Sequence, residues 1–315
     1  VLDTNENSGD NFSLTVTGYC DVTGTLTLND SAVSVAALRC KSGAVVTQGS
    51  SGTLELATGS NFGGTEGSAY SLRNLDGTSD INLGGTTTVT GGSYFEPRTA
   101  TVYASVLNNI VWNSGQYWVG EIRIGGTLVV NAAKHMQPYG GSKNVTVVGA
   151  VTLNGQLSAY PNGHADLNNM SFASLDIANG GAYAATTGTT NITSGNFNNS
   201  GTFTHNDGMF KFTHATNTQN MQSAGSVEPV FYKLDNAQDA SGGTVVVWKS
   251  ITVIHTLSQT GGRYFQFKGD QGSLTVTLGS STVACTVTEG NRCLATLSGA
   301  GPVKFYGADQ LKPWV

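Results

Sequence analysis

Residues 24–35 read GTLTLNDSAVSV, and this stretch contains the pattern that decides the fold. In Leu26-Thr-Leu28 and in Val33-Ser-Val35 an apolar side chain stands at every second position, which is the period of a strand that buries one face. The Asn-Asp-Ser segment between them supplies side chains that bond their own backbone in turns. The stretch therefore predicts two short strands joined by a tight turn.

The same alternation recurs along most of the chain. Further strands of this kind are expected at 12–16, 54–56, 81–83, 122–124, 145–147, 151–153 and 274–278. Helical periodicity is nearly absent, and the best helical segment, residues 34–39, is far shorter than the roughly 12 residues that a marginally stable helix needs. We therefore predict an all-β protein.

A Gly-Thr pair followed by an apolar residue begins at residues 24, 52, 126 and 201. Such self-similarity indicates a solenoid, in which each coil stacks on the previous one. The spacing is uneven, so the predicted repeat is degenerate. We predict an irregular β-solenoid, similar to a parallel β-helix, for residues 1–270. The alternative is a β-sandwich, in which the same strands pair antiparallel through hairpins such as those at Asn154-Gly155 and Asn162-Gly163.

Two segments differ from the rest of the predicted solenoid. Aromatic and basic residues concentrate between about 94 and 139, which predicts an insertion or a contact patch. Trp112, Tyr117 and Trp118 are its candidate contacts with a glycan or with another subunit, and packing in the core is the alternative for these large rings. Residues 271–315 are predicted to form a C-terminal cap, because the last coil of a solenoid otherwise exposes an unpaired edge.

The four cysteines fall into two local pairs, and neither pair has the spacing of a zinc or redox motif. Cys20 and Cys40 are 20 residues apart, about one small coil, so we expect them to stack on neighbouring coils as a disulfide. Cys285 and Cys293 flank Glu289 symmetrically, which predicts a disulfide across a hairpin in the cap. Disulfides favour an extracellular location, and buried free thiols in a cytosolic protein are the alternative.

The charge of the chain limits its partners. Charged residues make up 11% of the sequence and the formal net charge is −5, so no basic footprint for nucleic acid is expected. The longest apolar runs are far below the roughly 18 residues that span a bilayer, so no membrane insertion is expected. A surface of hydroxyls and amides suits packing against copies of the same chain, because burying an unpaired charge costs more.

Residues 197–213 read FNNSGTFTHNDGMFKFT, and residues 231–267 read FYKLDNAQDASGGTVVVWKSITVIHTLSQTGGRYFQF. This wording resembles the degenerate repeats of large β-solenoid surface and fibre proteins of bacteria and their viruses, over roughly residues 140–280. The resemblance implies an extracellular or virion structural protein, and it carries no catalytic residues to transfer. Met209, Lys211, Trp248 and His255 depart from the simpler repeats, which indicates local specialisation.

Few residues suggest catalysis or metal binding. Parallel β-helix enzymes that degrade polysaccharides gather carboxylates on one face. The local groupings in this chain are Asp76 with Asp80, Asp235 with Asp239, and His164 with Asp166. All of them lie in turn-like sequence, where Asp usually caps its own backbone, so a polysaccharide lyase or glycoside hydrolase is only an alternative. The five histidines are scattered, and neither a metal site nor a cofactor is expected.

The sequence thus favours a non-enzymatic structural subunit of an extracellular filament, surface fibre or virion fibre. Its expected partners are copies of itself, with surface glycans as an alternative if the chain is an adhesin. The N-terminal segment with Phe12, Leu14 and Val16 is predicted to join copies by strand addition. The chain begins at Val1 without an initiator Met, which is expected of a processed, secreted form.

Overall fold

The computed structural model divides the chain into two compact units, Val1–His164 (unit 1) and Ala165–Val315 (unit 2). In unit 1 it describes residues 2–3, 12–41, 43–57, 70–74, 80–90, 94–96, 105–115, 117–118, 121–138 and 144–159. In unit 2 it describes residues 169–214, 217–222, 228–238, 244–259, 264–268, 276–278, 286–289, 296–298 and 304–305. Statements about each unit refer to these residues.

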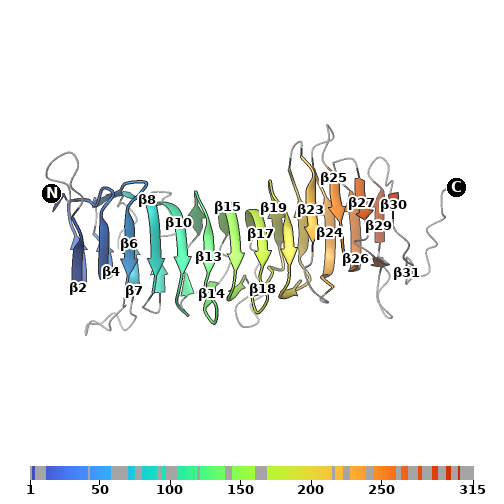
Figure 1. Ribbon diagram of the computed structural model, residues 1–315, viewed down its shortest axis with the longest axis horizontal. Coiled ribbons are helices and arrows are strands. Elements are labelled where there is room, and N and C mark those ends of the chain that lie inside the picture. The colour runs from blue at the N-terminus through green and yellow to red at the C-terminus, as the bar shows by residue number, and fades with distance from the viewer. Residues whose placement is uncertain are drawn as a thin grey trace. The chain divides into compact units, whose positions relative to one another are not determined.

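The strands of unit 1 stack coil on coil (Figure 1), and their parallel pairings define three rows. The first row contains β1 (Leu2–Asp3), β3 (Thr25–Thr27), β5 (Val45–Gln48), the first halves of β8 (Asp80–Val89) and β10 (Ser105–Trp112), β12 (Ile122–Ile124) and the first half of β15 (Val145–Leu153). The second row contains the first halves of β2 (Leu14–Val22) and β4 (Ala32–Cys40), β6 (Thr53–Leu56), the second halves of β8 and β10, β13 (Leu128–Val130) and the second half of β15.

The third row of unit 1 contains the second halves of β2 and β4, β7 (Tyr70–Asn74), β9 (Tyr94–Glu96), β11 (Tyr117–Trp118), β14 (His135–Pro138) and β16 (Gln156–Ser158). A strand that serves two rows bends between them. In β2 the pairing with β4 shifts by one residue between Val16 and Tyr19, and this bulge marks such a corner. The chain thus runs through all three rows before the next coil begins.

Apolar side chains in register fill the inside of unit 1. One column contains Leu83, Leu107, Ile124 and Val147, each at most 1% exposed. The side chains between them point outward, as in β12, where exposed Arg123 separates buried Ile122 and Ile124. Full burial of such aliphatic side chains stabilises the fold by about 1.5–3 kcal/mol each. The alternation in the sequence is therefore the pattern of an inner and an outer face.

Unit 2 also has three rows of parallel strands. The first contains the first half of β17 (Asn169–Ile177), β19 (Thr189–Ile192), β22 (Met209–Phe212), the second halves of β24 (Val230–Asn236) and β26 (Ile251–Gln259), and β29 (Thr286–Glu289). The second contains the second half of β17, β20 (Phe197–Asn199), β23 (Gln219–Gln222), β25 (Thr244–Val247), β27 (Tyr264–Lys268) and β30 (Thr296–Ser298). The third contains β18 (Ala182–Ala184), β21 (Thr202–Thr204), the first halves of β24 and β26, β28 (Val276–Leu278) and β31 (Lys304–Phe305).

Aromatic rings fill the inside of unit 2. The ring of Phe197 packs 4.8 Å from that of Phe210 and 6.0 Å from that of Phe231, measured between centroids. Phe203 packs 5.2 Å from Phe231, which joins the strands β21 and β24 of the third row. Such ring pairs add about 0.5–1.5 kcal/mol to the burial of their area. The core of this unit therefore depends on rings that meet across coils.

The structure confirms the predicted all-β solenoid. The described residues include no helix, and every strand pairing among them is parallel. The antiparallel pairing of a β-sandwich is therefore not the arrangement of these strands. The described strands of the aromatic-rich segment, β9 to β14, pair within the rows of unit 1, and an insertion or contact patch at 94–139 stays a prediction. Beyond residue 270, β28 to β31 pair in parallel with β26, β27 and β28. The boundary of a separate cap at residue 271 stays a prediction.

Candidate functional site

The first described coil of unit 1 exposes apolar side chains that the next coil buries. Leu14 and Val16 in β2 stand in register with Val33 and Val35 in β4. The β4 side chains are 4% and 2% exposed, whereas those of β2 are partly exposed. Phe12, just before β2, is 54% exposed. The predicted strand-addition segment therefore lies on an incompletely covered end of the described stack.

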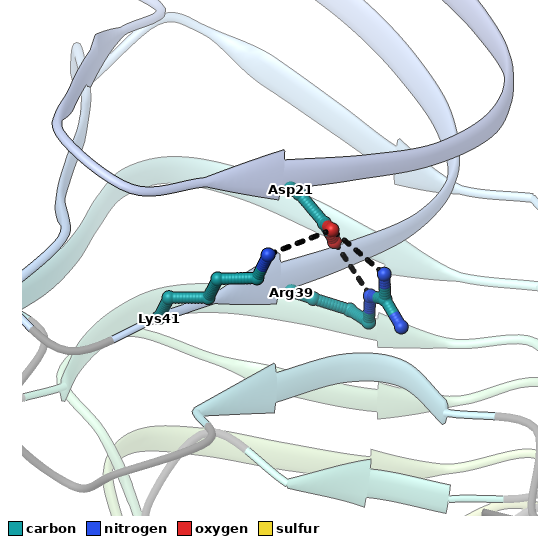
Figure 2. A network of polar contacts seen from close by, with 3 residues as sticks. All are labelled: Asp21, Arg39 and Lys41. Atoms are coloured by element: carbon teal, nitrogen blue, oxygen red, sulfur yellow. Dashed lines mark hydrogen bonds and ion pairs between the residues drawn. The ribbon is translucent and has the colours of Figure 1, made fainter.

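The outer face of the same coil carries a charged network, shown in Figure 2. The guanidinium of Arg39 donates two hydrogen bonds to the carboxylate of Asp21, at 2.6 and 2.7 Å, and Lys41 Nζ lies 3.3 Å from Asp21 Oδ2. Arg39 also lies over the ring of Tyr19, 4.1 Å from its centroid. The bonds from Arg39 are the main cause that lowers the pKa of Asp21, and burial opposes them. The network ties β2 to β4.

Cys20 and Cys40 are free thiols, so the predicted disulfide between them is wrong. They do lie on neighbouring coils, but Cys20 stands opposite Leu38, and Cys40 stands opposite Val22. The thiols are thus offset by two residues, about 6.6 Å along the strand, which together with the spacing between strands exceeds the reach of a disulfide. Burial raises the pKa of Cys40 to about 12 and that of Cys20 above its ordinary value. These shifts favour the protonated form of both thiols over the reactive thiolate.

Cys285 and Cys293 lie outside the described residues, so their disulfide stays a prediction. The neighbouring strands β29 and β30 do not pair with each other in the described part of the chain. They belong instead to the first and second rows of unit 2, where they pair in parallel with β26 and β27. The second arm of the expected hairpin, residues 291–294, lies outside the described residues, so the hairpin around Glu289 stays a prediction as well.

The predicted contact residues Trp112 and Trp118 are core residues. Both are 0% exposed, so neither ring meets a glycan or a second subunit. Trp112 packs edge-on against Phe95, with 5.6 Å between centroids, and its indole N–H donates to the carbonyl of His135 at 3.3 Å. The backbone of Tyr117 pairs with β9 and β14, and its side chain lies outside the described set. Both tryptophans therefore pack in the core, which was the alternative to a contact with a glycan or another subunit.

The carboxylates that the sequence grouped for a polysaccharide-degrading enzyme do not come together as an active site among the described residues. Asp235 is 1% exposed, pairs with Lys211 Nζ at 3.4 Å and accepts a hydrogen bond from Ser258 at 2.9 Å. Its charge is therefore compensated across three neighbouring coils. Asp76, Asp239, His164 and Asp166 lie outside the described residues, as does the side chain of Asp80. Among the described residues, no three His, Cys, Asp or Glu side chains gather closely enough to hold a metal ion.

A serine and a histidine on neighbouring coils were not recognised in the sequence. Ser158 Oγ lies 2.8 Å from Nε2 of His135, and it accepts a hydrogen bond from Gln156 Nε2 at 3.0 Å. The tautomer of His135 decides which of the two groups donates, and burial lowers the pKa of this imidazole. Among the described residues, no carboxylate orients His135. Ser158 is only 5% exposed. The pair therefore lacks the third member and the access of a hydrolase triad.

A stack of three rings lies at one corner of unit 2. His205, Tyr232 and His255 come from three successive coils. The ring centroids of His205 and Tyr232 are 5.8 Å apart at 21°, and those of Tyr232 and His255 are 4.9 Å apart at 35°. Lys233 Nζ lies 5.5 Å from the centroid of Tyr232. In the sequence, His255 stood out only as a departure from the simpler repeats, and nothing indicated that a tyrosine would lie between it and His205.

Comparisons with protein-family models, with curated proteins and with solved structures find no match to this chain. The resemblance to β-solenoid surface and fibre proteins is therefore supported at the level of the fold alone. Within the described residues, no helix is long and apolar enough to cross a membrane.

Proposed function

We propose that this chain is a structural subunit of an extracellular filament, surface fibre or virion fibre that joins copies of itself. The observation that carries the proposal is the partial exposure of Leu14 and Val16 in β2, at positions whose partners in β4 are buried. An end strand with uncovered apolar side chains can pair with a strand of another copy, which buries those side chains and extends the stack.

The distribution of exposed hydrophobic side chains supports the same end of the molecule. Three large hydrophobic residues are exposed in the described part of the chain, namely Phe12, Tyr19 and Val148. Two of them belong to the first coil, with Phe12 54% and Tyr19 43% exposed. Exposed apolar side chains that gather in one place are typical of interaction surfaces, whereas scattered ones are ordinary.

The outer face of the second row in unit 1 supports packing between copies. Its central column consists, in register, of Ser34, Glu55, Thr88, Val111, Val129 and Thr152. Glu55 is the one charged side chain among them, and its oxygens accept hydrogen bonds from Ser34 at 3.2 Å and from Thr90 at 3.4 Å. A face of hydroxyls and methyls loses little hydration energy when a second surface covers it.

The test places a charge on either face of β2 in the full chain. Val16→Lys puts an ammonium among the side chains that face the interior of the stack, where strand addition would bury it. Thr15→Lys is the matched control, because Thr15 lies on the same strand and is exposed. Sedimentation analysis and negative-stain microscopy of the wild type and the Thr15→Lys variant should show oligomers or filaments, and the Val16→Lys variant should remain monomeric.

Thermal melts monitored by circular dichroism establish that both variants are folded. Should Val16→Lys fail to fold, Phe12→Lys is the substitute, because Phe12 is exposed and precedes the strand. A wild-type chain that stays monomeric over the whole concentration range would contradict the proposal, and so would lysine variants at positions 12 and 16 that assemble like the wild type. The polysaccharide-degrading alternative stays a prediction, because His164 and Asp166 lie outside the described residues.

A further inference from the structure

The turn between β21 and β22, residues 205–208, is held by an imidazole. Nδ1 of His205 accepts a hydrogen bond from the backbone N–H of Asp207 at 3.0 Å. A ring nitrogen that accepts a bond carries no proton, so His205 is the neutral tautomer with its proton on Nε2. The state of this turn is therefore linked to the protonation of one side chain.

The turn that the imidazole holds is strained and packed tightly. Asn206 and Asp207 both have left-handed backbone conformations, with φ of 44° and 60°. Such conformations cost roughly 1–2 kcal/mol for a residue other than glycine, so the surrounding bonds have to maintain them. Asn206 Nδ2 donates to the carbonyl of Ala185 on the preceding coil at 2.7 Å, and a Cβ at Gly208 would meet the backbone of Thr186. The turn is thus attached to the coil before it.

We propose that residues 205–208 form an acid-sensitive latch, in which protonation of His205 removes the acceptor of the Asp207 amide and loosens a turn that the Gly208 N–H also closes by donating to the His205 carbonyl at 3.0 Å. The proton acquired on Nδ1 faces the amide proton, so the hydrogen bond is lost. The carboxylate of Asp207 offers an alternative acceptor, since its Oδ1 lies 3.4 Å from Nδ1 and its side chain is 73% exposed.

The other charged groups around His205 define the pH range of the latch. Across the ring of Tyr232 lies the ammonium of Lys233, and His255 stacks on the far side of that ring. The preceding coil contributes residues 185–188, which are Ala, Thr, Thr and Gly and do not titrate. Burial lowers the pKa of His205, and Asp207 partly opposes this shift. The neutral imidazole, and with it the closed turn, is therefore favoured at neutral pH, and the latch opens as the pH falls below the ordinary histidine range.

The experiment follows the Asp207 amide through an acid titration of the full chain. Hydrogen exchange, corrected for the intrinsic pH dependence, should show protection at Asp207 that falls about fivefold to tenfold between neutral pH and pH 5, as expected for one lost hydrogen bond. In His205→Asn the shorter amide oxygen accepts from the same N–H as an Asx-turn but does not titrate. Its protection should not change with pH.

The turn at Ala178–Gly181, in which Gly181 N–H donates to the Ala178 carbonyl at 2.8 Å, serves as an internal reference without a histidine. Nitrogen chemical shifts of His205 give a second measurement that needs no variant, and they should show the Nε2–H tautomer at neutral pH. The latch is refuted if Nδ1 carries the proton at neutral pH. It is also refuted if the Asp207 protection is unchanged through the titration of His205, or if His205→Asn shows the same pH dependence as the wild type.

Discussion

Gln48 and Gln219 are both buried, but their amide groups have different surroundings. Gln48 is 6% exposed and stands in register with Leu83, at the start of an aliphatic column, and neither of its amide atoms has a hydrogen-bond partner among the described residues. Gln219 is 0% exposed. Its Nε2 donates to the carbonyls of Ile192 and Gly195, at 3.0 and 2.9 Å, and its Oε1 accepts from Gln238 at 2.7 Å.

The same substitution should therefore have opposite effects at the two glutamines. Gln48→Leu removes an unsatisfied buried amide, which costs about 1–3 kcal/mol, and extends the aliphatic column, so stability should rise by about 1–2 kcal/mol. Gln219→Leu breaks the hydrogen bonds of Gln219 to four polar groups, one of which is the backbone N–H of His214, and should lower stability by about 2–4 kcal/mol. Chemical denaturation of each variant measures both changes. A lower denaturation midpoint for Gln48→Leu would show that the amide has a stabilising partner.

Which residues face inward was predictable at the residue scale, but their partners were not. Alternation identifies Leu26, Leu28 and similar positions as core, because period two depends only on neighbours in the chain. The partners of Gln219 are carbonyls one coil earlier, and their position depends on the lengths of the intervening turns. The stack of His205, Tyr232 and His255 was unpredictable for the same reason.

At the scale of an element, two glycines of the repeated Gly-Thr phrase differ in their surroundings. A Cβ at Gly52 would lie 2.6 Å from the carbonyl oxygen of Asn29 on the preceding coil. A Cβ at Gly24 would have nothing within 4 Å. Gly52 is therefore needed for the close approach of two coils at a corner, and Gly24 is not.

Alanine substitutions at Gly52 and Gly24 test whether glycine is required at each position by the close approach of another coil. Gly52→Ala should lower stability by about 1–3 kcal/mol, because the backbone of Asn29 has to move. Gly24→Ala should leave stability unchanged or raise it by up to about 1 kcal/mol, because alanine restricts the unfolded chain. Thermal unfolding measures both variants, and equal melting temperatures for the two would indicate that the corner at residue 52 adapts without cost.

The pairing of elements was only partly predictable. The Gly-Thr phrase indicated stacked coils, and at Gly52, though not at Gly24, glycine is needed because another backbone approaches closely. The spacing of Cys20 and Cys40 predicted neighbouring coils correctly. The spacing gave the wrong register, because the residue opposite Cys20 on the next coil is Leu38, two residues before Cys40. The coil between them also includes the bulge between Val16 and Tyr19. A slip of this size keeps the side chains on the same face, so alternation alone does not detect it.

At the scale of the whole molecule, composition predicted a neutral exterior but not the place of the large rings. Trp112 and Trp118 belong to the core of unit 1 although they lie in the most polar and aromatic part of the sequence. Their positions depend on the register of three rows, which local patterns do not encode. Local patterns encode the outer faces and the end of the stack least, because packing constrains few side chains there.

The response of assembly to salt distinguishes an apolar joint from an electrostatic one. The end of the stack at β2 presents Phe12, Leu14 and Val16, whereas its charged network of Asp21, Arg39 and Lys41 is already paired internally. If copies join through the apolar side chains, sodium chloride should leave the concentration at half-assembly nearly unchanged, since salt screens exposed charges but not apolar contacts. Sulfate should lower that concentration, because it strengthens the burial of apolar surface. Light scattering over a concentration series in each salt measures the effect, and assembly that dissolves in sodium chloride would assign the joint to charged side chains.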